Sequence, residues 1–223
     1  MATPDTHTAF LIFTRSEAEE ARVKGVGCPR LFRAMNQRVK RLARRTGYPV
    51  VVVEGRDQVG HTFGQRLTHA FRKVFDQGYE RVIALGNDCL NLRLSDLRQA
   101  VAALDTQPAV LGPDLDGGAY LIGLRRQAFR PGALEALPWQ EAELWKALAN
   151  YCGTYYRLRA ERDADDEGAL RAAIRHCRDL CFRGLLIRLL KPLRLLPPVS
   201  APLLLSRSCF SHRFFRGPPG RLA

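Results

Sequence analysis

The chain has 223 residues, of which 46% are hydrophobic and 26% charged, and its formal net charge is +13. A chain of this length buries one substantial core but not two, so we expect one domain with an appendage. Residues 177–223 hold nine basic residues and one acid, a net +8, which leaves +5 for the other 176 residues. Because the excess lies in the tail and the body has no known nucleic-acid-binding motif, we expect no nucleic-acid partner.

Cysteine usage and the N-terminus indicate the compartment. Six cysteines are scattered along the chain without a CxxC pair or a His/Cys metal spacing, which is typical of free thiols in a reducing environment. The first seven residues are polar and do not resemble a secretion signal. No run approaches the roughly 20 apolar residues needed to span a bilayer. We therefore expect a cytoplasmic protein.

Short apolar runs alternate with amphipathic segments, the pattern of a sheet covered by helices on both faces. Each run is rich in β-branched and aromatic residues, whereas the segments between them have helical periodicity. In chain order, we expect a strand over 9–13, a helix over 31–45, a strand over 49–54, a helix from Phe63 that ends at Gly78, and a strand over 81–85.

The second half continues this alternation. Ser95 is expected to be the N-cap of a helix that runs to Leu104, because Asp96 follows in the first turn. Next come strands over 109–111 and 120–124 joined by a turn, a helix over 140–150, a strand near 154–158 and a last helix over 167–177. The elements predict a single three-layer α/β/α domain with a mostly parallel, Rossmann-like sheet over 1–176. We expect residues 177–223 to form a basic, partly helical and partly disordered tail.

Within this tail, residues 184–196 are rich in leucine, with basic residues three apart. Two interpretations stay open. The segment can lie on an anionic membrane surface, which would place the protein peripherally at the inner membrane. Alternatively it packs on the body, with the remainder to Ala223 disordered.

Three acidic loops follow predicted strands, where ligands bind in α/β proteins. The first is Gly86-Asn87-Asp88-Cys89, in which a carboxylate can hold a divalent cation that neutralises a diphosphate. The second, 114–118, combines Asp116 as a candidate base with two glycines that permit close approach of a ligand. The third, 163–167, has paired carboxylates that can complete a metal site. The simpler interpretations are an ordinary turn, a hairpin turn and a helix cap, respectively.

Four segments between Phe63 and Leu170 resemble those of a known family, both in their residues and in their order along the chain. They read "FGQRLTHAFRKVFDQGYERVIALGNDCL", "VLGPDLDGGAYLIGL", "LPWQEAELW" and "RDADDEGAL". They are similar to bacterial proteins of unassigned function that are related to the arsenosugar-biosynthesis glycosyltransferases. That resemblance implies the GT-A fold of nucleotide-diphospho-sugar transferases.

The resemblance also implies roles for individual residues. Asp88 and either Asp163 or Asp165 match acids that share a Mg²⁺ or Mn²⁺ ion in GT-A relatives. The D-G-G-x-Y/F segment looks like the sugar or acceptor side, and Trp139 offers an indole face for a sugar or plugs the core. The implied substrate-binding residues are Asn87, Gly117, Gly118, Tyr120 and Trp139.

Two departures from the family pattern concern the first loop and residue 90. Many relatives have K-x-P-x-x-G-x-x-K-T-R after the first strand, where this chain has "TRSEAEEARVKG". Arg15, Arg22 and Lys24 are the cations left to bind a phosphate, so Arg15 and Lys24 join the candidate substrate-binding residues. Leu90 stands where relatives commonly have proline.

The function predicted from the sequence is a metal-dependent glycosyltransferase. A nucleotide-sugar donor binds across the strand ends, a cation bridges its diphosphate, and a hydroxyl of an unidentified acceptor attacks the anomeric carbon, with Asp116 as the base. One alternative is a nucleotidyltransferase that releases pyrophosphate. Another is a catalytically silent nucleotide-sugar-binding protein associated with the membrane.

Overall fold

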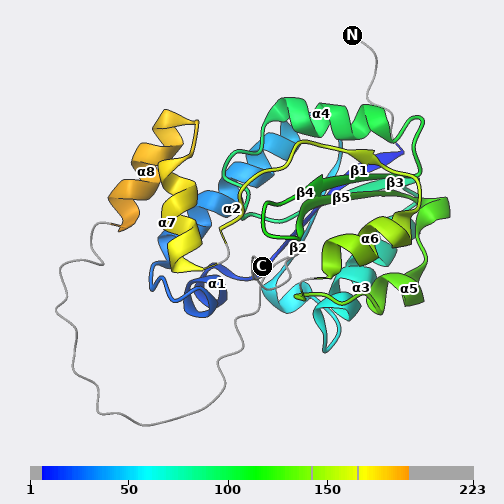
Figure 1. The fold of residues 1–223 in the computed structure, drawn as a ribbon, viewed down its shortest axis with the longest axis horizontal. Coiled ribbons are helices and arrows are strands. Elements are labelled where there is room, and N and C mark those ends of the chain that lie inside the picture. Colours follow the sequence, from blue (N-terminus) through cyan, green and yellow to red (C-terminus); the bar gives the residue numbers. More distant parts are fainter. Residues whose placement is uncertain (1–6, 142, 165, 191–223) are drawn as a thin grey trace, which may run out of the picture.

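The computed structural model describes residues 7–141, 143–164 and 166–190, which build a six-stranded sheet between layers of helices (Figure 1). The strands are β1 (Thr8–Thr14), β2 (Val50–Glu54), β3 (Arg81–Leu85), β4 (Ala109–Pro113), β5 (Ala119–Arg125) and β6 (Tyr156–Arg157). Their order is β2-β1-β3-β5-β4-β6, and β5 alone among these strands runs antiparallel to its neighbours. The predicted mostly parallel α/β sheet is confirmed.

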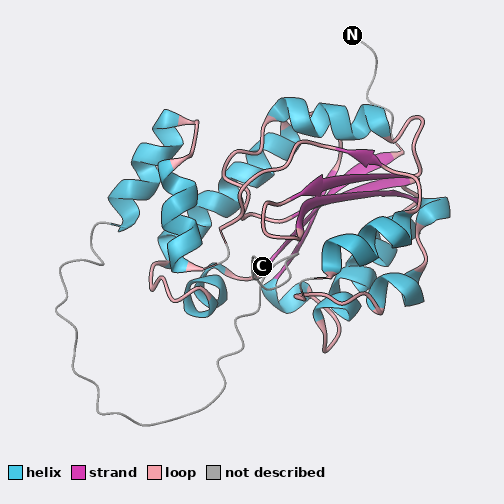
Figure 2. Cartoon of the chain, in the orientation of Figure 1, coloured by secondary structure: helices cyan, strands magenta, loops and turns pink. Residues whose placement is uncertain are grey.

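Helices cover both faces of this sheet (Figure 2). They are α1 (Glu17–Val23), α2 (Pro29–Arg44), α3 (Phe63–Asp76), α4 (Leu94–Ala103), α5 (Pro131–Glu135), α6 (Leu144–Cys152), α7 (Glu167–Arg175) and α8 (Leu180–Leu190). Helices α3, α5 and α6 lie on one face and α2 and α4 on the other, while α7 and α8 stand at the side next to α1 and α2 (Figure 1). No helix among the described residues is long and apolar enough to cross a bilayer.

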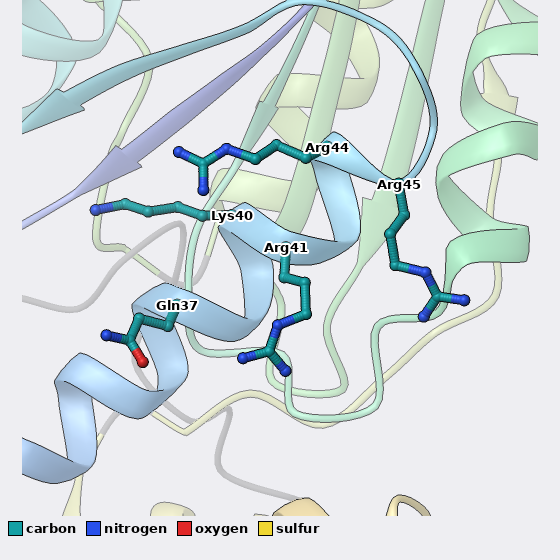
Figure 3. Close-up of a pocket in the computed structure, with 5 residues that line it drawn as sticks. All are labelled: Gln37, Lys40, Arg41, Arg44 and Arg45. Carbon is teal, nitrogen blue, oxygen red and sulfur yellow. The ribbon is translucent and has the colours of Figure 1, made fainter.

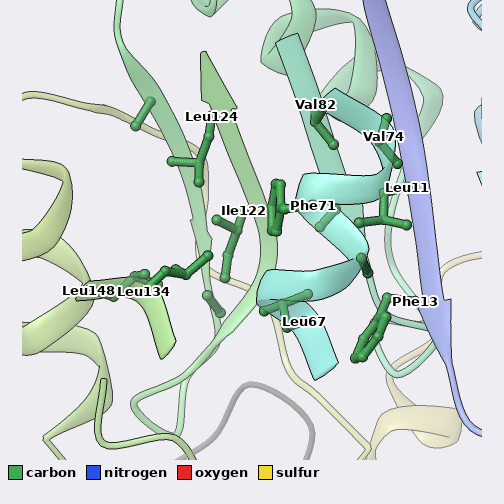
Figure 4. Close-up of a cluster of buried hydrophobic side chains, with 14 of the residues drawn as sticks. Leu11, Phe13, Leu67, Phe71, Val74, Val82, Ile122, Leu124, Leu134 and Leu148 are labelled. Carbon is green, nitrogen blue, oxygen red and sulfur yellow. The ribbon is translucent and has the colours of Figure 1, made fainter. Parts of the chain in front are cut away.

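Strand β1 has its side chains buried on both faces, because successive residues of a strand point to opposite sides. Leu11 and Phe13 pack with Phe71 and Val74 of α3 in one cluster (Figure 4). Ile12 belongs to the other cluster, with side chains of α2 and α4. The continuous apolar run in the sequence therefore reflects a strand covered from both sides.

A third cluster joins α7 and α8 to α1 and α2. Leu186 and Leu190 are 0% and 7% exposed there and pack with Phe32 and Met35 of α2. Part of the leucine-rich segment, 184–190, thus packs on the body. Residues 191–196 and the rest of the tail lie outside the described residues, as does the predicted disorder to Ala223.

The predicted helix starts need correction. The N-cap of α4 is Arg93 and not Ser95, because the Asp96 carboxylate at the third helical position accepts a hydrogen bond from the Arg93 amide at 2.8 Å. Helix α6 begins at Leu144 and not near Gln140, whose φ of 74° is incompatible with a right-handed helix.

Other elements differ in extent or were not predicted. Strand β6 spans two residues, against the five expected over 154–158. Helix α7 is not the last helix, since α8 follows it, and α1 and α5 were not predicted at all. Helices α1 and α5 are seven and five residues long, and such short helices depend on tertiary packing more than on local preference.

Candidate functional site

The candidate site lies at the edge of the sheet where the parallel strands end. Strands β1, β3, β4 and β6 all finish at this edge, and β5 begins there because it runs in the opposite direction. The loops after β1 and β3, the turn between β4 and β5, and the segment after β6 therefore leave the sheet side by side. All three acidic loops found in the sequence belong to this edge.

Lys24, directly after α1, lies at the centre of a buried charge network. Its side chain is 0% exposed, and its ammonium donates to the carboxylate of Asp88 and to the main-chain oxygen of Ala164, the latter at 2.6 Å. The Glu20 carboxylate, one turn earlier on α1, lies 3.0 Å from the same nitrogen. Lys24 thus joins the first loop, the loop after β3 and the segment after β6.

Arg15 extends this network toward the surface of the sheet edge. It follows β1, is 3% exposed, and its guanidinium lies 3.4 Å from the Glu20 carboxylate. Glu19 is a second, more distant partner at 4.0 Å. Charges therefore alternate from Arg15 through Glu20 and Lys24 to Asp88. Buried charges persist in proteins when each is paired in this way.

Asn87 ties the end of β3 to the neighbouring elements. Its side chain is buried and donates to the Asn36 side-chain oxygen of α2 at 2.5 Å, and Asn36 donates to Glu54 at the end of β2 at 3.0 Å. Lys40 completes this chain with an ion pair to Glu54 at 2.8 Å. The geometry holds Asn87 in place beside Asp88 and fixes the direction of that loop.

Asp163, 1% exposed, lies in the same buried region as Asp88. Its carboxylate accepts a hydrogen bond from the amide of Ala164, the residue bound by Lys24. Burial raises the pKa of the Cys89 thiol, and the negative charge of Asp163 raises it further. The first and third acidic loops are joined through Lys24, which bonds Asp88 and Ala164, the residue after Asp163, while the shared metal role of these acids stays a prediction. Asp165 lies outside the described residues.

The described residues do not fit a resident divalent cation in this arrangement. No group of three or more His, Cys, Asp or Glu side chains among them could hold a metal ion. The carboxylate of Asp88 and the carbonyl of Ala164 instead surround the Lys24 ammonium. Asp166, the other acid of the third loop, is the N-cap of α7 and accepts from the Ala169 amide at 2.7 Å, as the capping interpretation expected.

The turn between β4 and β5 is organised by Asp114. Its carboxylate accepts hydrogen bonds from the amides of Asp116 at 2.8 Å and Gly118 at 2.7 Å. Gly117 has a φ of 93°, in the left-handed region that favours glycine. This places the half-buried Asp116 at the start of β5, one strand away from Asp88.

Tyr120 faces the interior of the fold. It is 3% exposed, and its hydroxyl donates to the main-chain oxygen of Arg159 at 3.0 Å. A Cβ added at Gly112 would lie 2.6 Å from the Tyr120 ring, so the ring packs flat on that glycine. Burial raises the pKa of Tyr120. In this arrangement the tyrosine links β5 to the segment after β6.

A cleft of about 600 Å³ opens beside this edge. The three arginines that line it are Arg15, Arg22 and Arg66, and three carboxylates, those of Glu19, Glu135 and Glu141, line it as well. The lining also includes the start of α3, and the positive end of a helix dipole favours anions. Burial lowers the pKa of Arg66, and the positive charge of Arg15 lowers it further. The guanidinium groups of Arg15 and Arg66 therefore lie close enough in this cleft to repel each other. Arg66 was not singled out in the sequence, where its only signal was its place one turn into α3.

Trp139 forms part of the wall of this cleft. Its indole nitrogen donates to the main-chain oxygen of Leu134 at 2.9 Å, and its ring lies 5.1 Å from that of Phe63. A Cβ at Gly64 would lie 2.7 Å from the indole. The ring is therefore held by packing on α3, so the core role and the place at the cleft coexist.

A second basic pocket, of about 370 Å³, lies on α2. Lys40 and Arg44 extend to one side of the helix, and Arg41 and Arg45 to the other (Figure 3). This pocket runs along the second half of α2, and Lys40, which lines it, pairs with Glu54 at the end of β2.

Comparison with solved structures identifies the fold. A candidate nucleotide-diphospho-sugar transferase from Desulfovibrio desulfuricans G20 has a TM-score of 0.72 at 22% identity, covering 84% of this chain and 98% of that one. Rv0371c from Mycobacterium tuberculosis H37Rv has a TM-score of 0.50 at 16% identity over 75% of this chain and 97% of its own. Its homologue from Mycobacterium sp. strain JC1 has 0.51 at 14%, over 82% and 98%. Such identities show a shared fold and nothing further.

Sequence comparison gives the family. No curated protein matches the chain. A family profile described as "uncharacterized protein conserved in bacteria (DUF2064)" matches residues 20–141, more than half of the chain. The expected link to arsenosugar biosynthesis stays a resemblance. The chain belongs to this bacterial DUF2064 family and has the fold of the D. desulfuricans protein.

Proposed function

We propose that the protein is a nucleotide-diphospho-sugar transferase whose donor binds in the cleft at the carboxyl edge of the sheet. The observation that carries this proposal is the position of Arg15, which lines the cleft and also joins the buried network of Glu20, Lys24 and Asp88. The fold shared with the D. desulfuricans protein, a candidate transferase of this class, supports the same assignment.

The diphosphate of the donor would lie against Arg15, Arg22 and Arg66. Guanidinium groups bind phosphate oxygens through paired hydrogen bonds, and a bound anion relieves the repulsion between Arg15 and Arg66. The start of α3 lines the same cleft, where the positive end of the helix dipole would also favour an anion. The volume of about 600 Å³ lies within the range of cofactor and nucleotide sites.

In the proposed reaction an acceptor hydroxyl attacks the anomeric carbon of the donor. The bond from this carbon to the diphosphate oxygen breaks, and the nucleoside diphosphate leaves with that electron pair. Asp116 is the proposed base that takes the hydroxyl proton, while the arginines of the cleft stabilise the charge that develops on the leaving group. Gly117, Gly118 and Tyr120 are proposed to shape the acceptor side, and Trp139 the wall of the donor side.

Whether the protein binds the divalent cation expected from the sequence is a question for experiment. Asp88 and Asp163, with Asp165, remain the residues proposed to bind Mg²⁺ or Mn²⁺ when the resemblance alone is considered. Because Lys24 already binds the Asp88 carboxylate, we route no step of the reaction through a metal ion.

Thermal-shift measurements with a panel of nucleotide sugars and nucleoside triphosphates test the proposal. A transferase donor should raise the melting temperature at ligand concentrations well above its Kd. A clear preference for a triphosphate would favour the nucleotidyltransferase instead. A shift with a nucleotide sugar but no release of nucleoside diphosphate would favour the catalytically silent binding protein, and no shift with any member of the panel would contradict the proposed function.

Peripheral membrane contact is a separate proposal. Within 184–190, Leu185 and Ile187 are 40% and 41% exposed, whereas Leu186 and Leu190 are buried. The exposed pair and the basic residues that follow suit weak contact with an anionic bilayer. Co-sedimentation with anionic vesicles tests this, and the change of Leu185 and Ile187 to serine should reduce binding. Equal sedimentation of both proteins would contradict a role for this helix.

A further inference from the structure

Three oxygens from three separate segments converge on the Lys24 ammonium. They belong to Asp88 after β3, to Glu20 on α1 and to the main chain of Ala164 after β6. We propose that Lys24 is the internal cation of the site, which occupies the oxygens that a divalent cation would need, so that the diphosphate ligand binds without a metal. This inference rests on the proposed function for the nature of the ligand, but its central claim concerns the ion.

The geometry of Lys24 is that of a fixed ion. The ammonium lies within ion-pair distance of two carboxylates, and the Phe32 ring centroid lies 5.8 Å away. Glu20 and Lys24 are four residues apart around the end of α1, so the backbone holds the pair together. With its side chain 0% exposed, Lys24 is held in place before any ligand arrives.

A divalent cation and Lys24 compete for the same place. Carboxylate and carbonyl oxygens are the ligands that Mg²⁺ and Mn²⁺ prefer, and the ammonium already takes those of Asp88 and Ala164. A metal ion bound to either group would lie within a few ångströms of the ammonium. Like charges at such a distance repel strongly in a buried site.

Lys24 would act on the ligand through Glu20 and Arg15. The Glu20 carboxylate lies between the two cations, 3.0 Å from Lys24 and 3.4 Å from Arg15. Because Lys24 fixes Glu20, it also fixes the guanidinium that lines the cleft. Lys24 is therefore a positioning residue, and a purely structural lysine would not alter the metal requirement of binding.

The first experiment measures binding of Mn²⁺ alone to the full chain by electron paramagnetic resonance. The wild-type protein should bind no Mn²⁺ at this site, whereas Lys24→Met should gain one bound ion, because the acids lose their internal cation. Lys73→Met is the matched control, since Lys73 is exposed on α3 and should leave the spectrum unchanged. Tight Mn²⁺ binding by the wild type, or a folded Lys24→Met that binds none, would overturn the proposal.

The second experiment titrates a nucleoside diphosphate, such as UDP or GDP, by calorimetry in EDTA and in Mn²⁺. The wild-type affinity should differ by less than about twofold between the two buffers, and Lys24→Met should bind about tenfold more weakly in EDTA but recover in Mn²⁺. Wild-type binding that disappears in EDTA would overturn the proposal.

The two experiments separate this inference from the proposed function. If neither protein binds any nucleoside diphosphate, the proposed function fails, while the Mn²⁺ spectra still decide the role of Lys24. If Lys24→Met does not fold, the wild-type protein decides the matter through its Mn²⁺ binding and its response to EDTA.

Discussion

Lys24 donates a hydrogen bond of 2.6 Å to the main-chain oxygen of Ala164, which lies 140 residues further along the chain. This contact joins the loop after the first strand to the segment after the last strand. The carboxylates of Glu20 and Asp88 share the same nitrogen, so the position of the first loop depends on residues from the whole length of the fold.

Glu20→Gln should lower the free energy of unfolding by about 3 kcal/mol, since loss of one member of a buried ion network leaves its partners poorly compensated. Glu20 is 0% exposed and lies between Arg15 and Lys24. Urea denaturation of the full chain measures the change. Glu19→Gln is the control: its side chain is 38% exposed and its pair with Arg15 is long, so a change below about 0.5 kcal/mol is expected. Similar losses in both variants would contradict the importance of the buried pair.

Arg66→Met should weaken binding of a nucleoside diphosphate by about tenfold, which corresponds to the loss of one charge-assisted hydrogen bond. Stability without ligand should change little or rise, because burial and the charge of Arg15 lower the pKa of Arg66 and so disfavour its charged form. Arg72→Met, an exposed arginine on the same helix, provides the control for both measurements. Calorimetry that shows equal affinities for the two variants would place the anion elsewhere.

Gly112→Ala should destabilise the protein by about 2 kcal/mol, because the new Cβ would meet the Tyr120 ring at 2.6 Å. Displacement of the ring would also disturb its hydrogen bond to Arg159. Gly132→Ala serves as the comparison, since a Cβ there meets nothing within 4 Å, and a helical alanine should add at most about 1 kcal/mol. Thermal unfolding of the two variants should therefore move in opposite directions.

The order in which thiols react is expected to follow their burial. Cys181 is exposed, whereas Cys89, Cys152 and Cys177 are buried and have raised pKa values, chiefly because of burial. Iodoacetamide at pH 8 should alkylate Cys181 first among these four, since the thiolate is the reactive form. Peptide mass spectrometry over time measures the order. Labelling of Cys152 as fast as that of Cys181 in folded protein would contradict the packing of α6.

Stability should fall in alkaline solution as buried thiols resist ionisation. Burial raises the pKa of Cys152 from its ordinary value of 9.0 to about 12. Below pH 9 the thiol is protonated in both states, so it gives no pH dependence. Between pH 9 and 12 the unfolded chain loses this proton while the folded protein keeps it, so the free energy of unfolding decreases. Cys152→Ala should reduce the slope of stability against pH in this range, and an unchanged slope would contradict the assignment to Cys152.

Local patterns predict the sheet and the positions of the acidic loops. The apolar run Arg81–Leu85 predicts β3 with the same two ends that the structure has, because this strand is buried on both faces. Asp88, three residues later, therefore lies at the sheet edge. Helix α3 was found by its periodicity, and its Thr62–Gln65 capping box explains where it begins. These features depend on neighbours close in the chain, which a sequence displays directly.

The charge network could not be derived in the same way. Lys24 was assigned to a ligand phosphate, but its partners Asp88 and Ala164 are 64 and 140 residues away, beyond any periodic pattern. Glu20 gave no signal, because an acid on a short amphipathic segment is ordinarily solvated. The same holds for α8, whose buried leucines resemble a membrane-binding segment until α2 is placed beside them.

The packing of α7 and α8 on α1 and α2 gives the molecule a second cooperative unit beside the sheet. Side chains of α7 and α8 belong to the apolar cluster of this unit and to neither cluster of the sheet, so these two helices should open at a lower free energy than the strands. Amides in these helices should then exchange with deuterium faster than those of β1 and β3. The leucines of the C-terminal helix would thus set how readily this side of the molecule opens.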